Sequence, residues 1–342
     1  MLSISSPHIT GKASVSKVML TLASTMIPGI LCLIYFLSWG YLVNLILASL
    51  TAICIEATIL KVRQRPVLFF IKDGSALVTA LLLACALPPL APWWLTVIGT
   101  GIAIIFGKQL FGGLGQNPFN PAMVAYALLL VSLPVYMTTR WAAIESPSGL
   151  LESLQTIFNL GQAPLDALTG ATPLDHYKQN ISRFSANDLL IEPLFQGSFA
   201  IGWTQVNLAF LVGGLIMLWR RIITWHIPVA VLATITLMAL LFSHDIDAKV
   251  PLLTHLFSGS TMLAAFYIAT DPASAATSNK GKLFYGIGIG LLIYLIRTWG
   301  NYPDATAFAV LLMNFAAPLI DHYTRPRVYG HKSAVKGFKK DD

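Results

Sequence analysis

Charged residues and cysteines are both scarce in this sequence of 342 residues. Asp, Glu, Lys and Arg together make up 11% of the chain, whereas a soluble domain carries about 25%. This composition excludes an ordinary cytosolic enzyme. Cys32, Cys54 and Cys85 lie in apolar stretches and form no C-x-x-C pair, so neither a disulfide framework nor a self-contained iron–sulfur site is indicated. We interpret the three cysteines as small apolar side chains.

Two nucleotide-binding patterns are also missing. The sequence contains no G-x-G-x-x-G after a strand and no G-x-x-x-x-G-K-[ST], the glycine-rich turns that hold dinucleotides and nucleoside triphosphates. We therefore do not expect this chain alone to oxidise a nicotinamide or to hydrolyse a nucleotide. We assign no metal site.

Apolar residues dominate what is present. Hydrophobic residues make up 56% of the chain, the mean hydropathy is +0.70, and a helix that spans a bilayer needs about 20 largely apolar residues. The sequence predicts an all-α polytopic membrane protein. The first apolar run is too long for a signal-peptide core and lacks a small-residue cleavage site, so we interpret it as an uncleaved span. About ten spans are expected, several of them short or broken, at residues 18–38, 41–60, 67–88, 93–107, 121–137, 202–219, 227–243, 251–269, 283–297 and 305–320.

The positions of basic residues predict the orientation of these spans. The net charge of +7 reflects membrane topology, because Lys and Arg near span ends stay on the cytoplasmic side; no nucleic-acid partner is expected. One arrangement satisfies nearly all of the basic residues, and it places both termini in the cytoplasm. The predicted parts are an N-terminal membrane repeat (1–137), an outward, periplasmic segment (138–201), a C-terminal membrane repeat (202–320) and a basic cytoplasmic tail (321–342).

The two membrane parts resemble each other. Asp73-Gly74-Ser75-Ala76 has a counterpart in Ser258-Gly259-Ser260-Thr261, and the apolar run after each element ends at a proline. In the predicted topology the first element begins on the cytoplasmic side and the second on the outer side. The sequence therefore predicts two inverted repeats of about five helices each, a pattern with which transporters build a site near the membrane midplane. The alternative is that these small residues only permit close helix packing.

The outward segment contains the most specific motif. Residues 166–174 read Asp-Ala-Leu-Thr-Gly-Ala-Thr-Pro-Leu, which resembles the D-x-x-[ST]-G-A-T signature at which a flavin transferase esterifies FMN through its phosphate to the last threonine. Thr172 offers the attachment oxygen, and Gly170 and Ala171 leave the backbone open for the modifying enzyme. Pro173 keeps the acceptor extended rather than helical, and Asp166 is a candidate for docking the donor or its metal. The alternative is a plain solvated turn.

Two further segments extend this resemblance over nearly the whole chain. With the motif and the ten-span layout, residues 111–122 (Phe-Gly-Gly-Leu-Gly-Gln-Asn-Pro-Phe-Asn-Pro-Ala) and 267–272 (Tyr-Ile-Ala-Thr-Asp-Pro) look like the family of the RnfD protein of Rnf (Rsx) electron-transport complexes and of NqrB in the sodium-pumping quinone reductase. Thr169 stands where the usual variant of the motif has serine.

The resemblance implies a membrane flavoprotein subunit of a redox-driven ion pump in a bacterial inner membrane. Thr172 would carry covalent FMN, with Asp166, Thr169, Gly170 and Ala171 as its surrounding motif, and related proteins hold a second, noncovalent riboflavin. Other membrane and soluble redox subunits would deliver and remove the electrons, and a flavin transferase would be needed for maturation. No motif in this sequence fixes the riboflavin site, the transported ion (Na⁺ or H⁺) or the direction of electron flow.

Glu56 is a second candidate residue, because it falls inside the predicted second span. An ionisable group at that depth is costly and is by default a functional hypothesis, here a place on the ion pathway. The alternative is a pair with a neighbouring helix. Two rival functions also remain open for the chain: a flavin-free channel or carrier for a small solute, which inverted repeats would suit, and a structural anchor for redox partners.

Overall fold

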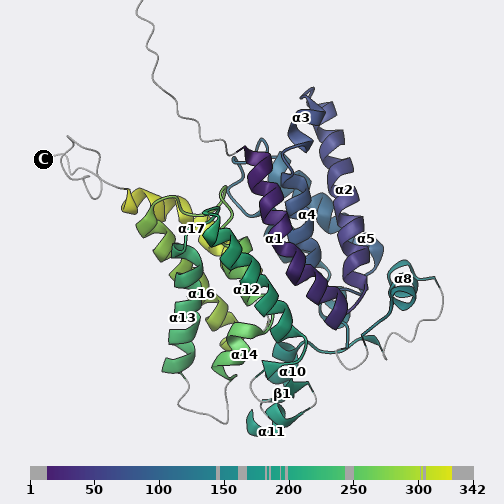
Figure 1. Ribbon diagram of the computed structural model, residues 1–342, viewed down its shortest axis with the longest axis vertical. Coiled ribbons are helices and arrows are strands. Elements are labelled where there is room, and N and C mark those ends of the chain that lie inside the picture. The colour runs from purple at the N-terminus through teal and green to yellow at the C-terminus, as the bar shows by residue number, and fades with distance from the viewer. Residues whose placement is uncertain are drawn as a thin grey trace, which may run out of the picture.

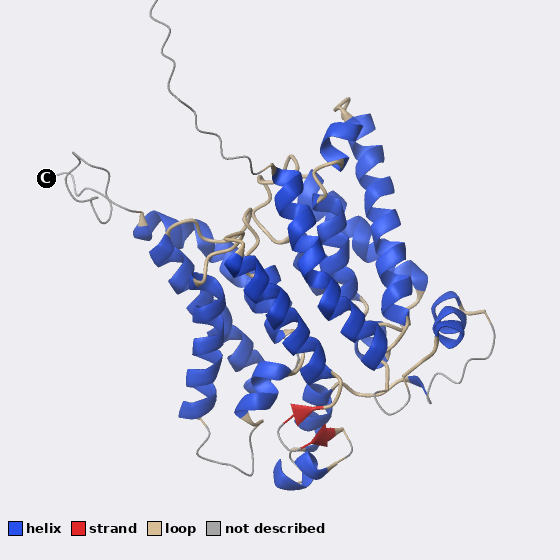
Figure 2. Ribbon diagram, viewed as in Figure 1, coloured by secondary structure: helices blue, strands red, loops and turns tan. Residues whose placement is uncertain are grey.

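The computed structural model shows a chain folded almost entirely into helices (Figures 1 and 2). It describes residues 14–143, 147–160, 168–181, 183–184, 186–192, 194–196, 199–242, 250–300, 302 and 306–325. The first half contains α1 (Val15–Phe36), α2 (Gly40–Val62), α3 (Val67–Ile71), α4 (Ser75–Ala86), α5 (Trp93–Ile102), the π-helix η1 (Ala103–Gln109), α6 (Pro121–Ser132) and α7 (Pro134–Thr139). The second half contains α12 (Trp203–Trp219), α13 (His226–Leu241), α14 (Leu252–Phe257), α15 (Thr261–Leu263), the π-helix η2 (Ala264–Ile268), α16 (Asn279–Trp299) and α17 (Thr306–Thr324).

Each of the ten predicted spans coincides with helix, so the all-α membrane fold is confirmed. By length and composition α1, α2 and α16 could each cross a membrane unaided, and the apolar helices α4, α6, α12 and α13 are shorter. Three spans are broken. The breaks fall between α3 and α4, between α6 and α7 before Pro134, and between α14 and α15. A proline cannot continue the preceding helix without loss of a hydrogen bond, and glycines with positive φ mark the other two breaks.

The two halves have the inverted relationship that the sequence predicts. Gly74 precedes α4 with φ +75°, and Gly259 precedes α15 with φ +62°. In Figure 1, α3 lies at one end of the molecule and α14 at the opposite end. A buried basic side chain reaches the start of the broken helix in each half: Lys108 Nζ donates to Ser75 Oγ (2.6 Å), and Arg297 Nη1 donates to Thr261 Oγ1 (3.0 Å).

The halves join through helices that occupy equivalent places, since α1 packs on α12 and α6 packs on α17. Gly213 on α12 is essential to the first contact. A Cβ at this position would lie 2.1 Å from the carbonyl oxygen of Thr25 and 2.1 Å from the hydroxyl of Tyr267. Tyr267 itself donates to that Thr25 carbonyl at 2.8 Å. The absence of a side chain therefore lets α12 approach α1 closely enough for η2 to bond to the first half.

The segment between the halves is more regular than predicted. The sequence has no strong helical period here, yet the segment contains α8 (Leu150–Phe158), α10 (Pro173–Asn180), α11 (Ala186–Ile191), β1 (Phe195–Gln196) and β2 (Phe199–Ala200). The two strands pair antiparallel, with Phe195 opposite Ala200. The start of α1 and the end of α17 lie at one end of the molecule, and α10 and α11 lie at the other (Figure 1).

Candidate functional site

Thr172 lies at the point where extended backbone becomes helix α10. Its φ and ψ are −68° and 154°, its Oγ1 accepts a hydrogen bond from the Asp175 N–H at 3.3 Å, and Pro173 occupies the first helical position. Threonine is a good N-cap, and proline at this position loses no helical hydrogen bond. The prediction that Pro173 keeps Thr172 extended is confirmed. The same proline also starts a helix, which the sequence pattern did not indicate.

The residues before Thr172 are held by backbone pairing. Ala143 N–H donates to the Leu168 carbonyl, and Gly170 N–H donates to the Trp141 carbonyl, each at 2.9 Å. Thr169 and Ala142 form an antiparallel bridge between them, and a Cβ on Gly170 would come within 3.2 Å of the Ala143 Cα. The prediction that Gly170 leaves the backbone open is therefore wrong, because this glycine allows close pairing of two strands. Ala171 is exposed.

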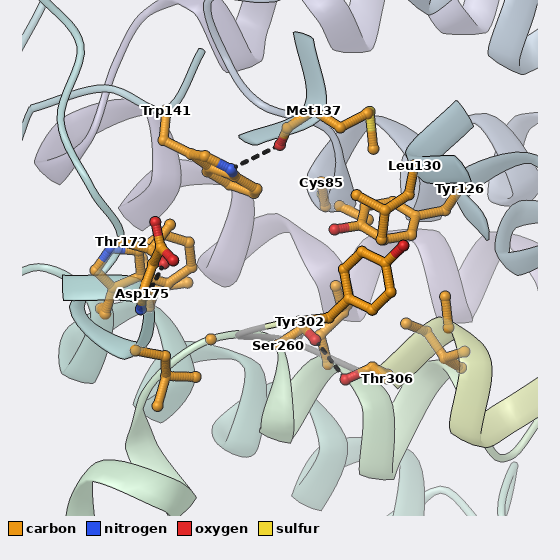
Figure 3. A pocket seen from close by; sticks show the side chains of 18 of the residues that line it. Cys85, Tyr126, Leu130, Met137, Trp141, Thr172, Asp175, Ser260, Tyr302 and Thr306 are labelled. Atoms are coloured by element: carbon orange, nitrogen blue, oxygen red, sulfur yellow. Dashed lines mark hydrogen bonds between the residues drawn. The ribbon is translucent and has the colours of Figure 1, made fainter. Parts of the chain in front are cut away.

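Thr172 lines a cavity whose walls come from both halves of the molecule. Figure 3 shows Thr172 and Asp175 on one side of it, Trp141 and Met137 on another, and Ser260, Tyr302 and Thr306 on a third. The indole of Trp141 donates to the Met137 carbonyl at 3.0 Å, and the hydroxyls of Ser260 and Thr306 are 2.8 Å apart. The lining is largely apolar and aromatic, and includes Leu33, Cys85, Ala86, Met123, Tyr126, Leu130, Leu174, Trp203, Val206, Phe210, Leu263 and Ile268.

These residues fit a flavin that is joined by its phosphate to Thr172. The N–H groups at the start of a helix favour a phosphate, and Thr172 presents its hydroxyl at the start of α10. An apolar, aromatic cavity with a few hydroxyl groups is typical of sites that bind a planar cofactor. Sequence reasoning missed the cavity because its walls come from segments far apart in the chain, such as Trp141 and Tyr302.

Glu56 lies on α2 and is not among the residues that line this cavity, and 1% of its surface is exposed. Its Oε1 is 2.5 Å from Lys108 Nζ and accepts a hydrogen bond from Gln109 Nε2 at 2.8 Å, both from η1. Its Oε2 has no hydrogen-bond partner among the described residues. Lys108 connects this pair to Ser75, whose Oγ donates in turn to Asp73 Oδ1. The alternative of a pair with a neighbouring helix is thus observed.

Asp166, the first residue of the motif, lies outside the described residues, and so does Ala167. Of the predicted site residues, Thr172 lines the cavity, whereas Thr169, Gly170, Ala171 and Glu56 are not among its lining residues.

Comparison with known proteins gives consistent results along the whole chain. The sequence profile of the NQR2, RnfD, RnfE family matches residues 2–330. A protein of Marinobacter nauticus is 53% identical over 337 residues, which cover 97% of this chain and 96% of the relative. Proteins of Pseudomonas aeruginosa (52%; 98% of each chain) and Aliivibrio salmonicida (50%; 96% of this chain and 98% of the relative) are similarly close. All three are named as the D component of an ion-translocating oxidoreductase complex.

Proposed function

The chain belongs to the NQR2, RnfD, RnfE family, and we propose that it works as the flavin-carrying membrane subunit of an ion-translocating oxidoreductase complex. The names of its relatives support the assignment to such a complex. The flavin is FMN, attached through a phosphoester to Thr172. Electrons reach this subunit from other subunits of the complex and leave through them, because the sequence has no nucleotide-binding pattern or cysteine cluster of its own.

In this proposal each part of the site has a simple physical task. Thr172 holds the phosphate at the start of α10, where helix N–H groups favour negative charge. The apolar walls around Tyr302 and Trp141 exclude water from the space beside it. The bound FMN supplies the electron chemistry, and the protein supplies placement and environment. The single observation that carries the proposal is that the threonine of the flavin signature lines the cavity between the two halves.

The proposal is tested by denaturing electrophoresis of protein co-expressed with a flavin transferase. We expect a band that fluoresces under ultraviolet light in the native sequence and in Thr156→Ala, a matched change in α8. Thr172→Ala should give no fluorescence, and the native peptide that contains Thr172 should carry the added mass of FMN. A dark native band without added mass would overturn the proposal in favour of a flavin-free carrier. The amount of flavin released when the protein is denatured would give the amount of noncovalently bound riboflavin, which the family resemblance implies.

We extend the proposal to Glu56 as a residue of the ion pathway. Its support is that a carboxylate oxygen of Glu56 is buried without a hydrogen-bond partner among the described residues, in a half of the molecule where Asp73, Ser75 and Lys108 form a continuous polar chain. Buried ionisable groups of membrane helices commonly mark such pathways. Substitution of Glu56 together with Lys108 separates this role from a structural one, as argued below.

The proposed orientation places both termini in the cytoplasm and Thr172 in the periplasm, in a bacterial inner membrane. The support is that α1 begins and α17 ends at one end of the molecule, opposite α10 (Figure 1). A membrane-impermeant thiol reagent tests this on intact cells. A single cysteine introduced at the exposed Arg183 should be labelled, whereas one introduced in the tail at Lys336 should not be; the opposite result would reverse the orientation.

A further inference from the structure

Lys178 joins the helix that begins at Thr172 to the end of a membrane helix. Its Nζ donates to the carbonyl oxygens of Ile296 (3.3 Å), Tyr302 (3.1 Å) and Gly300. Ile296 lies in the last turn of α16, and Gly300 is the C-cap of that helix. A lysine ammonium has three N–H donors, and all three find an acceptor here. The contact therefore uses the full hydrogen-bonding capacity of the side chain.

The charge of Lys178 suits this position. The carbonyl groups at the end of a helix carry a partial negative charge, so a cation is favourable there. The Ile296 carbonyl accepts the N–H of Gly300 at 2.9 Å in addition to the Lys178 ammonium. Partial burial lowers the pKa of Lys178, and the nearby Asp175 carboxylate raises it. Burial has the larger effect, so the pKa of Lys178 lies below the ordinary lysine value, and the three carbonyl oxygens and the Asp175 carboxylate offset only part of the cost of burying the ammonium.

The remaining contacts of α10 hold it within the outward segment. His176 Nε2 is 2.5 Å from Glu192 Oε2, and the ring of Tyr177 packs edge-on against Phe195 at 6.2 Å between centroids. Burial raises the pKa of Tyr177 to about 12, so this ring is neutral. These contacts join α10 to Glu192 and Phe195, whereas the Lys178 contacts join it to the end of α16.

We propose that Lys178 is the positioning residue that keeps the flavin in the cavity. Thr172 and Lys178 lie on one short helix, about 9 Å apart along its axis, and Tyr302, whose carbonyl Lys178 contacts, lines the same cavity as Thr172 (Figure 3). Lys178 thereby fixes both the attachment point and the part of the cavity wall that contains Tyr302. This role rests on the proposed attachment of FMN to Thr172. It concerns where the flavin is held, not whether it is attached.

The experiment compares Lys178→Met, which keeps the length of the side chain and removes the charge, with Lys178→Arg, which keeps the charge. Arg183→Met is the matched control, because Arg183 is exposed in the same segment. Native flavin fluorescence is titrated with acrylamide, a neutral quencher whose approach does not depend on the lost charge. Flavin attachment is measured in parallel on denaturing gels.

We expect Lys178→Met to retain its flavin, with a severalfold rise in the quenching constant and a lower fluorescence anisotropy. Lys178→Arg should restore most of the protection, and Arg183→Met should behave as the native sequence. Equal quenching in Lys178→Met and the native protein, with flavin attached in both, would overturn the proposal.

A second measurement does not need the flavin. In the flavin-free Thr172→Ala background, amide hydrogen exchange of α10 should become severalfold faster on addition of Lys178→Met, because the helix opens more easily once its contact with α16 is lost. Unchanged exchange would also overturn the role of Lys178. If the native protein carries no flavin at all, the proposed function fails, and this second measurement still reports on the contact between α10 and α16.

Discussion

Lys108 and Glu56 form an ion pair that is buried inside the first half of the molecule, with Nζ 2.5 Å from Oε1 and side chains that are 3% and 1% exposed. Removal of one partner leaves the other charge buried and uncompensated, which typically costs about 3–5 kcal/mol. We therefore expect Glu56→Gln and Lys108→Met each to lower the stability of the purified protein by about this amount. The double variant should lose much less stability than the sum of the losses in the two single variants. Denaturant unfolding in detergent measures the stability of all three variants.

The same variants separate an ionic role of Glu56 from a structural one. In the double variant the fold recovers but the carboxylate is absent. If Glu56 serves the ion pathway, vesicles that contain the complete complex with the double variant should still lose ion uptake while they retain electron transfer from the soluble donor. Ion uptake that recovers together with stability would show that the pair is needed only for folding.

The position of Gly213 predicts how a side chain there would affect the contact between α1 and α12, which joins the two halves. Because a Cβ there would lie 2.1 Å from backbone and hydroxyl oxygens, Gly213→Ala should push α12 away from α1 and cost about 1–3 kcal/mol. Gly101→Ala is the control, since its Cβ would lie 3.4 Å from the end of the Ile55 side chain, and alanine in a helix is intrinsically favoured over glycine. Thermal unfolding should show a lower midpoint for the first variant and not for the second. Equal midpoints would mean that α1 and α12 can separate without loss.

Thr172 caps α10, and in the proposed function it is also the attachment point of the flavin, so the two tasks can be separated. Asn and Asp cap helices as well as Thr, whereas Ala costs about 1 kcal/mol at this position. We expect Thr172→Asn to lose all covalent flavin without loss of stability, and Thr172→Ala to lose the flavin and about 1 kcal/mol as well. Gel fluorescence and unfolding of protein made without the flavin transferase test the two tasks independently. A stability loss in Thr172→Asn equal to that in Thr172→Ala would mean that the cap hydrogen bond from Asp175 contributes little.

The membrane part of the fold was predictable from the sequence because its elements are set by local properties. Long apolar runs must form helices in a bilayer, where every backbone group needs an internal partner. The breaks at Gly74 and Gly259 were visible in the sequence as a repeated glycine-serine pattern, and both glycines adopt a positive φ in the structure. The short helices of the outward segment were missed, since α8 and α10 are only nine and eight residues long and such helices depend on tertiary packing rather than on their own sequence.

The site was predictable only where a motif named it. Thr172 could be found because a specific string surrounds it, whereas its place in one cavity with Tyr302 depends on how distant parts of the chain pack together. Lys178 was one of several basic residues scattered in an outward segment. Its place in the last turn of α10 is known only from the structure, because the sequence did not predict that helix. Its three carbonyl partners come from more than a hundred residues further along the chain, so no local pattern could predict them.

If the proposed function is correct, the position of Thr172 also predicts when the flavin would be attached. Thr172 lines the cavity and its Oγ1 caps α10, and residues 168–170 are paired with residues 141–143. A transferase has to bring the phosphate of its flavin donor up to this oxygen, which requires that the segment leave its pairing. We therefore expect slow flavin addition to purified, folded, flavin-free protein, and faster addition where the segment is loosened.

Two variants loosen the segment by different means. Ala143→Pro removes the N–H that bonds to the Leu168 carbonyl, and Lys178→Met removes the contacts of α10 with the end of α16. Each should accelerate flavin addition in a time course with transferase and donor, and Arg183→Met should not. Because the two changes act on opposite sides of Thr172, acceleration by both would indicate that undocking of the whole segment limits the reaction. If the native protein is modified as fast as either variant, Thr172 is already accessible in the folded state. The flavin could then be attached either before or after the segment docks.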